Sequence, residues 1–350
     1  MSEGAAISWF ADIGLADRLA VGGKGGSLGE LTRAGIAVPP GFVVRTEAFE
    51  AFVRALDAEK PLRAPIEALD PADLSAVAAC TRMVRARIME CAMSTEVRAA
   101  ILSAHARLCG AERDVPVAVR SSATTEDAED ASFAGLQDTY LWVLGGEEVL
   151  RLVRSCWASL YSVESVCYRR THGLAEAGVA MAVVVQRMVD ARTAGVMFTR
   201  SPTTGDRSVV TIEGAWGLGS AVVSGEVTPD RWVVAKITGE ITVRDVSDKH
   251  VRHLPKTGGG VEDTPVPDEL RTAPCLSDAE LLVLKDVALR AERHYRRPQD
   301  IEWAIDRKDG SVLLLQSRPE TVWSARDAKP VAAPAANPLS HVMNIFGGRR

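Results

Sequence analysis

Apolar residues occur along the chain in short runs bounded by polar turns and in longer stretches with a helical period, which predicts both strands and helices. The segment 179–186 is almost entirely apolar and predicts a buried strand. Shorter runs predict further strands at 37–44, 115–120, 195–199, 208–213 and 231–236.

Helical periodicity marks three other regions. Residues 46–109 are rich in Ala, Arg and Leu and are interrupted by prolines, which predicts about three helices. Residues 146–174 also follow a helical period. Residues 277–295 predict an amphipathic helix with Ser277 as its N-cap.

A predicted hairpin carries the polar residues with the clearest chemistry. Residues 300–306 and 311–316 are expected to pair across a turn at 308–310. Asp300 and Glu302 are two apart and share a face of one strand, as Gln316 and Arg318 do on the next. A carboxylate beside an amide oxygen suits Mg²⁺, and the arginine would face phosphate. The alternative is a structural salt bridge between Glu302 and Arg318.

A glycine-rich run, GGKGG, surrounds Lys24. Glycines let backbone N–H groups gather around an anion, and a lysine adds a point charge for phosphate. The run lacks the GxxxxGK[ST] spacing of a Walker A loop. Ser27 and Glu30 have capping-box spacing, which predicts a helix starting at Ser27. A flexible turn with an exposed lysine is the alternative interpretation.

The stretch VRSSATTEDAEDASFAGLQDT combines an arginine with a Ser/Thr-rich turn. Arg120 leaves a predicted strand and can make a forked contact to phosphate oxygens. Gly135 permits close approach of the backbone to a ligand. We interpret the acidic residues 126–130 as a solvated loop.

Composition excludes several classes of function. Of 350 residues, 47% are hydrophobic, 41 are Lys or Arg and 46 are Asp or Glu, for a net charge of -5. This balance argues against a nucleic-acid partner, which needs a basic footprint. No apolar run reaches the ~18 residues of a membrane span, so no membrane association is expected. Six cysteines form no CxxC pair, and with no signal peptide we expect reduced thiols and a cytoplasmic location.

Taken together, the motifs resemble a known family. The stretches GGKGGSLGELTRAGIAVPPGFVV, VAVRSSATTEDAEDASFAGLQDTYL, AGVMFTRSP, EGAWGLGSAVVSGEVTPD and QDIEWAI…LLLQSRP occur in the order found in the N-terminal nucleotide-binding domain of phosphoenolpyruvate synthase and pyruvate phosphate dikinase. The resemblance covers nearly all of residues 7–323. The ATP domains of rifampin phosphotransferase and of phenylphosphate synthase are similar too.

The resemblance implies an ATP-grasp-like α/β fold of two lobes that hold Mg²⁺ and ATP between them. It implies an N-terminal lobe at 1–190, a C-terminal lobe at 191–323 and an Ala/Pro-rich linker or tail at 324–350. Independently of the resemblance, the Asp-, Gly-, Pro- and Thr-rich composition of residues 238–275 predicts a turn-rich and mobile insertion. Catalytic roles fall to Lys24, Arg120 and Arg318, and Mg²⁺ binding falls to Glu302 and Gln316. Nucleotide contacts are expected from Lys24, Arg120, Gly135, Leu136, Gln137, Gln186, Met188, Val189, Glu213, Asp300 and Arg318.

The resemblance also implies an activity. Family members transfer phosphate from ATP to a histidine in a swivelling domain, with AMP and phosphate released. None of the six histidines, His341 included, lies in the family's Gly-Gly-x-Thr/Ser loop. We therefore expect the acceptor histidine on a separate partner chain, with phenol as final acceptor in a phenylphosphate synthase-like enzyme. The alternatives are a phosphoenolpyruvate synthase-like component that uses pyruvate, an ATP-grasp ligase that forms an acyl phosphate, and a non-catalytic ATP sensor.

Overall fold

Two separate antiparallel sheets organise the chain, as a computed structural model shows for residues 6–112, 114–124 and 138–327. The first sheet has the order β1-β2-β5-β3-β4. Its strands are β1 (Ile7–Trp9), β2 (Gly41–Val44), β3 (Val117–Ala123), β4 (Thr139–Val143) and β5 (Met181–Arg187). The expected mixed α/β fold class is therefore confirmed.

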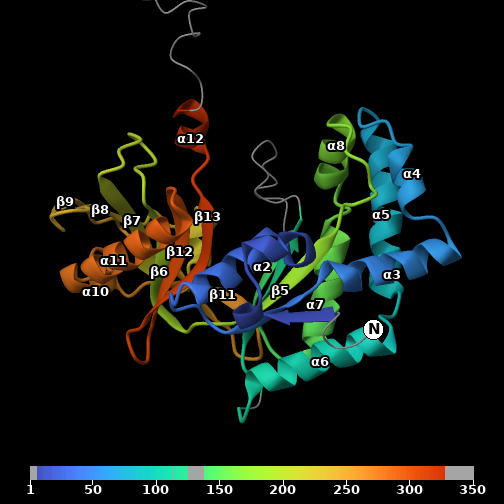
Figure 1. The fold of residues 1–350 in the computed structure, drawn as a ribbon. Helices are drawn as coiled ribbons and strands as arrows, with labels where there is room; N and C mark the ends of the chain where they lie inside the picture. The colour runs from blue at the N-terminus through green and yellow to red at the C-terminus, as the bar shows by residue number, and fades with distance from the viewer. Residues whose placement is uncertain (1–5, 113, 125–137, 328–350) are drawn as a thin grey trace, which may run out of the picture.

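The second sheet has the order β13-β12-β6-β7-β8-β9. Its strands are β6 (Ala191–Phe198), β7 (Val209–Trp216), β8 (Asp230–Ala235), β9 (Ile241–Asp245), β12 (Gln299–Asp306) and β13 (Val312–Pro319). The chain passes from one sheet to the other between β5 and β6. The two lobes stand side by side in Figure 1, and the exact domain boundaries stay a prediction.

Helices cover the outer faces of both sheets. Against the first sheet, α3 (Thr46–Glu59), α5 (Leu74–Glu90), α6 (Thr95–Cys109) and α7 (Gly146–Ser159) enclose the larger apolar core. Beside them lie α4 (Arg63–Glu67) and α8 (Val163–Thr171). The smaller core lies between the second sheet and α11 (Asp278–Tyr295), on the opposite side of the molecule in Figure 1. Short helices α9 (Ser220–Val223), α10 (Asp268–Arg271) and α12 (Val322–Asp327) complete the second lobe.

The predicted amphipathic helix is confirmed as α11. Ser277 accepts a hydrogen bond from the Glu280 backbone, and the Glu280 side chain accepts one from the Ser277 N–H, which closes a capping box. Leu281, Leu284 and Ala288 are buried against the sheet. The apolar positions whose spacing predicted this helix are the ones that pack against the sheet.

The helix start predicted at Ser27 is wrong. Helix α2 (Arg18–Arg33) already begins at Arg18 and bends at Gly22, whose φ is 71°. A Cβ at Gly22 would lie 2.1 Å from the Ser122 carbonyl oxygen, so only glycine allows α2 this close to β3. Ser27 lies inside the helix, where its hydroxyl donates to the Ser317 carbonyl at 2.5 Å.

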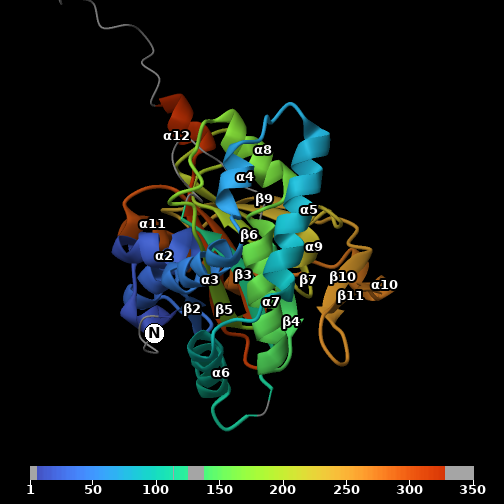
Figure 2. The same cartoon turned by 90° about the vertical axis from the view of Figure 1, so that its right-hand side faces the viewer.

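Residues 238–275 also differ from expectation. They are not a simple turn-rich insertion, because they contain β9, α10 and a hairpin formed by β10 (Val251–Pro255) and β11 (Val261–Pro265). The Gly260 N–H donates to the Trp142 carbonyl at 2.9 Å, so the tip of the hairpin contacts the first sheet. Figure 2 shows the hairpin beside β4. Residues 46–109, expected to form three helices, form four.

All six cysteines are unbridged. Within the described ranges, no helix is both long and apolar enough to cross a bilayer.

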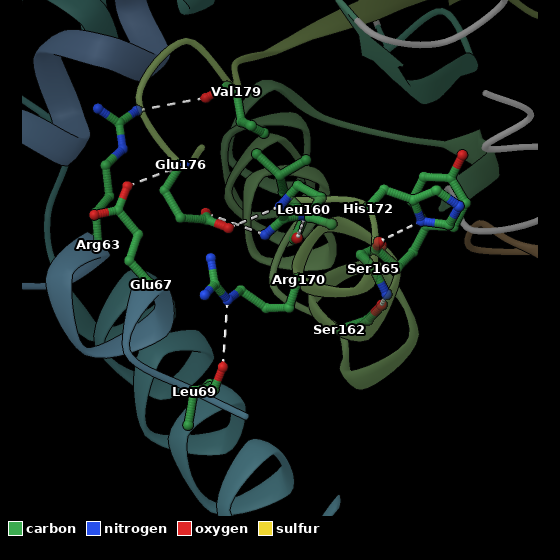
Figure 3. A network of polar contacts seen from close by, with 12 residues as sticks. Arg63, Glu67, Leu69, Leu160, Ser162, Ser165, Arg170, His172, Glu176 and Val179 are labelled. Atoms are coloured by element: carbon green, nitrogen blue, oxygen red, sulfur yellow. Dashed lines mark hydrogen bonds and ion pairs between the residues drawn. The ribbon is translucent and has the colours of Figure 1, made fainter. Parts of the chain in front are cut away.

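A buried ion pair fixes the loop after α8. Arg169 and Glu176 are joined by two hydrogen bonds of 2.9 and 3.2 Å, and their side chains are 1% and 0% exposed. Arg169 also donates to the Leu160 carbonyl at 2.7 Å, and the Glu176 N–H donates to Glu67 at 3.1 Å. Figure 3 shows how this network joins the loop to the neighbouring helices.

Removal of Arg169 should destabilise the first lobe. Arg169→Ala leaves the Glu176 carboxylate buried without its counter-ion, so we expect the free energy of unfolding to fall by about 3–5 kcal/mol. The matched control is Arg151→Ala, which breaks an exposed pair with Glu148 and should change stability by about 0–1 kcal/mol. Urea denaturation of both variants measures the difference, and equal losses would contradict a structural role for the buried pair.

Candidate functional site

The register of the second sheet places two rows of residues across four strands. Directly opposed residues in antiparallel strands project from the same face. The rows, read across β7, β6, β12 and β13, are Glu213, Val196, Glu302 and Gln316, and next to them Thr211, Phe198, Asp300 and Arg318. The predicted pairing of the hairpin is confirmed, with Glu302 opposite Gln316 and Asp300 opposite Arg318.

Arg120 joins the two sheets at the first of these rows. From β3 of the first sheet, its Nη2 donates to Glu302 Oε2 at 3.0 Å and to Gln316 Oε1 at 2.6 Å. Its Nη1 donates to the Leu315 carbonyl at 3.0 Å. Arg120 is only 7% exposed, and its Nε is buried with no hydrogen-bond partner among the described residues. A buried guanidinium therefore holds three acceptors of the second sheet.

A bulge supplies the third acceptor. Glu302 opposes Gln316, but the next pair along the ladder is Trp303 with Leu314, so Leu315 is an extra residue in β13. The extra residue of a bulge is left out of the ladder. Its carbonyl is thus available to Arg120. No local pattern in the sequence indicated this irregularity.

Asp300 and Arg318 form the second pair, with the Arg318 Nε 3.5 Å from Asp300 Oδ2. The salt bridge between Glu302 and Arg318 that we considered as an alternative does not form, because Glu302 pairs with Arg120. Burial raises the pKa of the Asp300 carboxyl to about 6; Arg318 opposes the rise and Glu320 adds to it. Burial also raises the pKa of Glu213.

Lys24 lies on α2 and is buried, not exposed on a flexible turn. The neighbouring Gly25 N–H donates to the Ser122 hydroxyl at 3.2 Å, and Ser122 in turn donates to the Val21 carbonyl at 3.0 Å. Ser122 and Arg120 are two apart on β3 and share a face. The glycine-rich run and the Arg120 strand, predicted from distant parts of the sequence, are therefore adjacent.

An apolar cluster lies where the chain crosses between the sheets. Its buried members are Val189, Ala191, Ala194, Leu218 and Ala304, and its half-buried members are Trp142, Met188, Val261, Leu313 and Leu315. It includes Met188 and Val189, two of the three residues in the segment 186–189 that are expected to contact the nucleotide. The third, Gln186, is buried at the end of β5, and its amide donates to the Pro39 carbonyl at 3.4 Å.

Gly135, Leu136 and Gln137, which are expected to contact the nucleotide, lie outside the described residues. Two further polar side chains near the site, Thr211 and Arg200, were not predicted from the sequence. Thr211 has a buried hydroxyl with no hydrogen-bond partner within the described ranges, and it lies in the same row as Asp300. Arg200, in the stretch AGVMFTRSP, is 5% exposed and its Nη1 lies 3.8 Å from Glu320. Thr211 could have been found from the sequence, because it lies two residues before Glu213 on a predicted strand and therefore shares its face.

The donor set fits Mg²⁺. Glu302 and Gln316 each direct an oxygen at one cationic nitrogen, Arg120 Nη2, so the two oxygens already converge on a common point of positive charge. A carboxylate and an amide oxygen are hard ligands of the kind that Mg²⁺ prefers.

Comparison with known proteins identifies the class to which this fold and site belong. The family model "Pyruvate phosphate dikinase, AMP/ATP-binding domain" matches residues 18–337, and the chain belongs to this family. A probable phosphoenolpyruvate synthase of Methanothermobacter thermautotrophicus is 43% identical over 317 residues, covering 90% of this chain and 46% of the relative. The phosphoenolpyruvate synthase of Pyrococcus furiosus is 38% identical over 355 residues, covering 90% and 44%.

The chain thus spans less than half the length of these curated relatives. Among solved structures, an L-amino acid ligase from Bacillus licheniformis matches 63% of this chain and 38% of its own, with a TM-score of 0.24 and 13% identity.

Asp300 should make stability depend on pH in the absence of metal and nucleotide. Its pKa of about 6 in the folded protein exceeds the unfolded value near 4, so the folded state binds the proton more tightly. The free energy of unfolding should therefore fall as pH rises from about 4 to 6. We expect Asp300→Asn to remove this fall and to be more stable than wild type by up to about 3 kcal/mol at pH 7, with little difference at pH 4.

Denaturant titrations at both pH values measure this effect. The control is Asp286→Asn, which alters an exposed carboxylate on α11. A pH profile of Asp300→Asn that is parallel to that of wild type would contradict the assignment.

Proposed function

We propose that this chain binds Mg²⁺ and ATP between its two sheets. It transfers phosphate from ATP in a dikinase reaction of the phosphoenolpyruvate synthase type. The observation that carries the proposal is the convergence of Arg120, from one sheet, on Glu302 and Gln316 of the other. Phosphoryl transfer requires mainly positioning and neutralisation of charge. A cation and two hard oxygens held at the meeting point of two lobes supply both.

The family resemblance suggests a role for each of the predicted site residues. Lys24, Arg120 and Arg318 would bind phosphate oxygens, with Gly135, Leu136 and Gln137 covering them. Gln186, Met188 and Val189 would contact adenine beside the apolar cluster, which provides the nonpolar wall that a base requires. Glu213 and Asp300 would complete the nucleotide contacts.

Arg120 has two possible sets of partners. Its present acceptors are protein oxygens, and phosphate oxygens offer the same guanidinium a forked, charge-assisted contact. When Arg120 turns to phosphate, Glu302 and Gln316 lose their cation and become available as ligands. Mg²⁺ held there would neutralise charge on the phosphates. Arg120 would thus protect these oxygens before ATP binds.

The acceptor in this proposal is a histidine outside the 350 residues, on a partner chain. That histidine attacks the β-phosphorus, the bond to the α-phosphate oxygen breaks, and AMP leaves; hydrolysis then releases the γ-phosphate. Relatives named phosphoenolpyruvate synthase favour pyruvate as the final acceptor. Phenol, expected from the resemblance to phenylphosphate synthase, is examined by the same experiment.

ATP labelled at the β-phosphorus tests the proposal. The chain is incubated with Mg²⁺, labelled ATP and a soluble extract of the source cells, with and without pyruvate or phenol. We expect AMP and acid-labile, base-stable label on a second protein. Transfer of that label to phosphoenolpyruvate or to phenylphosphate then identifies the acceptor. Formation of ADP only when a small carboxylic acid is added would favour an acyl-phosphate ligase, and ATP binding without turnover would favour a sensor.

Arg318 should be required for turnover and not for folding. Its side chain is 49% exposed, so Arg318→Ala should fold normally. Loss of one electrostatic contact in the transition state is worth about 3 kcal/mol, so we expect AMP formation to fall at least about 100-fold. The matched control is Arg307→Ala, at the other end of the hairpin and 44% exposed, which should retain activity. Wild-type turnover by Arg318→Ala would contradict its assigned role.

A further inference from the structure

A histidine and two carboxylates meet midway along the β10–β11 hairpin, away from the row of Glu302 and Gln316. His253 on β10 lies directly opposite Asp263 on β11, and Glu226 approaches from the segment after α9. One ligand atom of each residue lies within 4.8 Å of the other two. Among the residues that the structure describes, this is the one group of three His, Cys, Asp or Glu side chains so arranged.

The distances suit a transition-metal ion. His253 Nε2 lies 2.9 Å from Glu226 Oε2 and 3.2 Å from Asp263 Oδ1. Ligands bound to Zn²⁺ at about 2.0–2.1 Å in a tetrahedron are separated by about 3.3 Å. The two measured separations are close to this value. A metal would therefore enter between these atoms with only small shifts of the side chains.

The second nitrogen of the histidine is already held. Ser220 Oγ lies 2.8 Å from His253 Nδ1, at the start of α9. Metal-binding histidines usually donate their other N–H to an oxygen, which fixes the ring and the tautomer. With Nδ1–H donating to Ser220, the lone pair of Nε2 is directed at the two carboxylates. The imidazole is 9% exposed, and the backbone of His253 is held in place because the Leu218 N–H donates to its carbonyl at 3.0 Å.

The cluster is also accessible. Ser220, His253 and Asp263 line a cavity of ≈ 590 Å³ that extends to Trp142 and to the glycines at the tip of the hairpin. Glu226 and Asp263 are 48% and 70% exposed, so an ion can reach them from solvent. Three protein ligands beside an open cavity leave the fourth position for water.

We propose that Glu226, His253 and Asp263 form a binding site for a divalent transition-metal ion of the Zn²⁺ type. The lone pair of His253 Nε2 binds the ion, the Nδ1 proton stays directed at Ser220, and any proton carried by Nε2 passes to solvent. It joins both strands of the hairpin to the segment after α9. Because the hairpin tip contacts Trp142 through Gly260, and Trp142 and Val261 belong to the apolar cluster, the bound ion holds one wall of the region between the sheets.

Titration of the metal-free full chain with Zn²⁺, in competition with a chromophoric chelator and without nucleotide, tests the site. We expect wild type to bind one equivalent more than His253→Ala. Substitution with Co²⁺ should give the visible absorption of a four-coordinate ion in wild type only. The matched control is His250→Ala, an exposed histidine three residues earlier, which should keep the full stoichiometry. Loss of one equivalent in His253→Ala but not in His250→Ala separates the site from binding by other histidines and by the six cysteines, because both variants keep those cysteines.

Two further variants, Asp263→Asn and Ser220→Ala, test the site independently of whether His253→Ala folds. Asp263→Asn alters a side chain that is 70% exposed and should lose the same equivalent while remaining folded. Ser220→Ala should keep the site but weaken it by about 10-fold, as removal of a supporting hydrogen bond does. Zn²⁺ should also slow hydrogen exchange at the Gly260 amide in wild type. Equal stoichiometry and affinity in wild type, His253→Ala and Asp263→Asn would overturn the proposal.

Discussion

The two halves of this molecule depend on one buried cation. Arg120 belongs to the first sheet, and the three acceptors recorded for it belong to the second. A guanidinium removed from water is strongly destabilising unless its hydrogen bonds are satisfied by charged and polar groups. The sheets must therefore meet where Glu302, Gln316 and the Leu315 carbonyl are all within reach. That requirement places the ends of the lobes together and creates the site that we assign to the nucleotide.

The glycine-rich run makes this meeting sterically possible. Gly22 allows α2 to bend against β3, and the same helix then reaches the second sheet through Ser27. Tyr295, at the end of α11, donates to the Ser27 carbonyl at 3.2 Å. A segment that resembles a phosphate loop in composition thus also acts as the packing element between two sheets. Its glycines serve close contact of backbones as well as any approach to an anion.

Much of this organisation could be predicted from local patterns, since the responsible interactions are local. Helix α11 followed from apolar periodicity and from Ser277, and the pairing of strands β12 and β13 followed from the turn between them. The opposition of Glu302 and Gln316 did not follow from these patterns, because it depends on the bulge at Leu315. Contacts between distant segments could not be predicted. Ser27 has the spacing of a cap but donates to Ser317, 290 residues away. Arg120 was expected to face phosphate, and no local signal indicated that three protein oxygens would accept from it. The strands within 238–275 were hidden by a turn-rich composition.

The bulge at Leu315 has a consequence for how such chains can vary in length. Residues in the turn at 308–310 can be added or removed without moving the ladder, because the pairs on either side stay in register. One residue removed from β13 at the bulge would instead restore a regular ladder and withdraw the Leu315 carbonyl from Arg120. Insertions and deletions are therefore not equivalent along this hairpin: at the turn they alter a loop, and at the bulge they alter the coordination of a buried cation. Alignments of related chains that place a gap here should be judged by that difference.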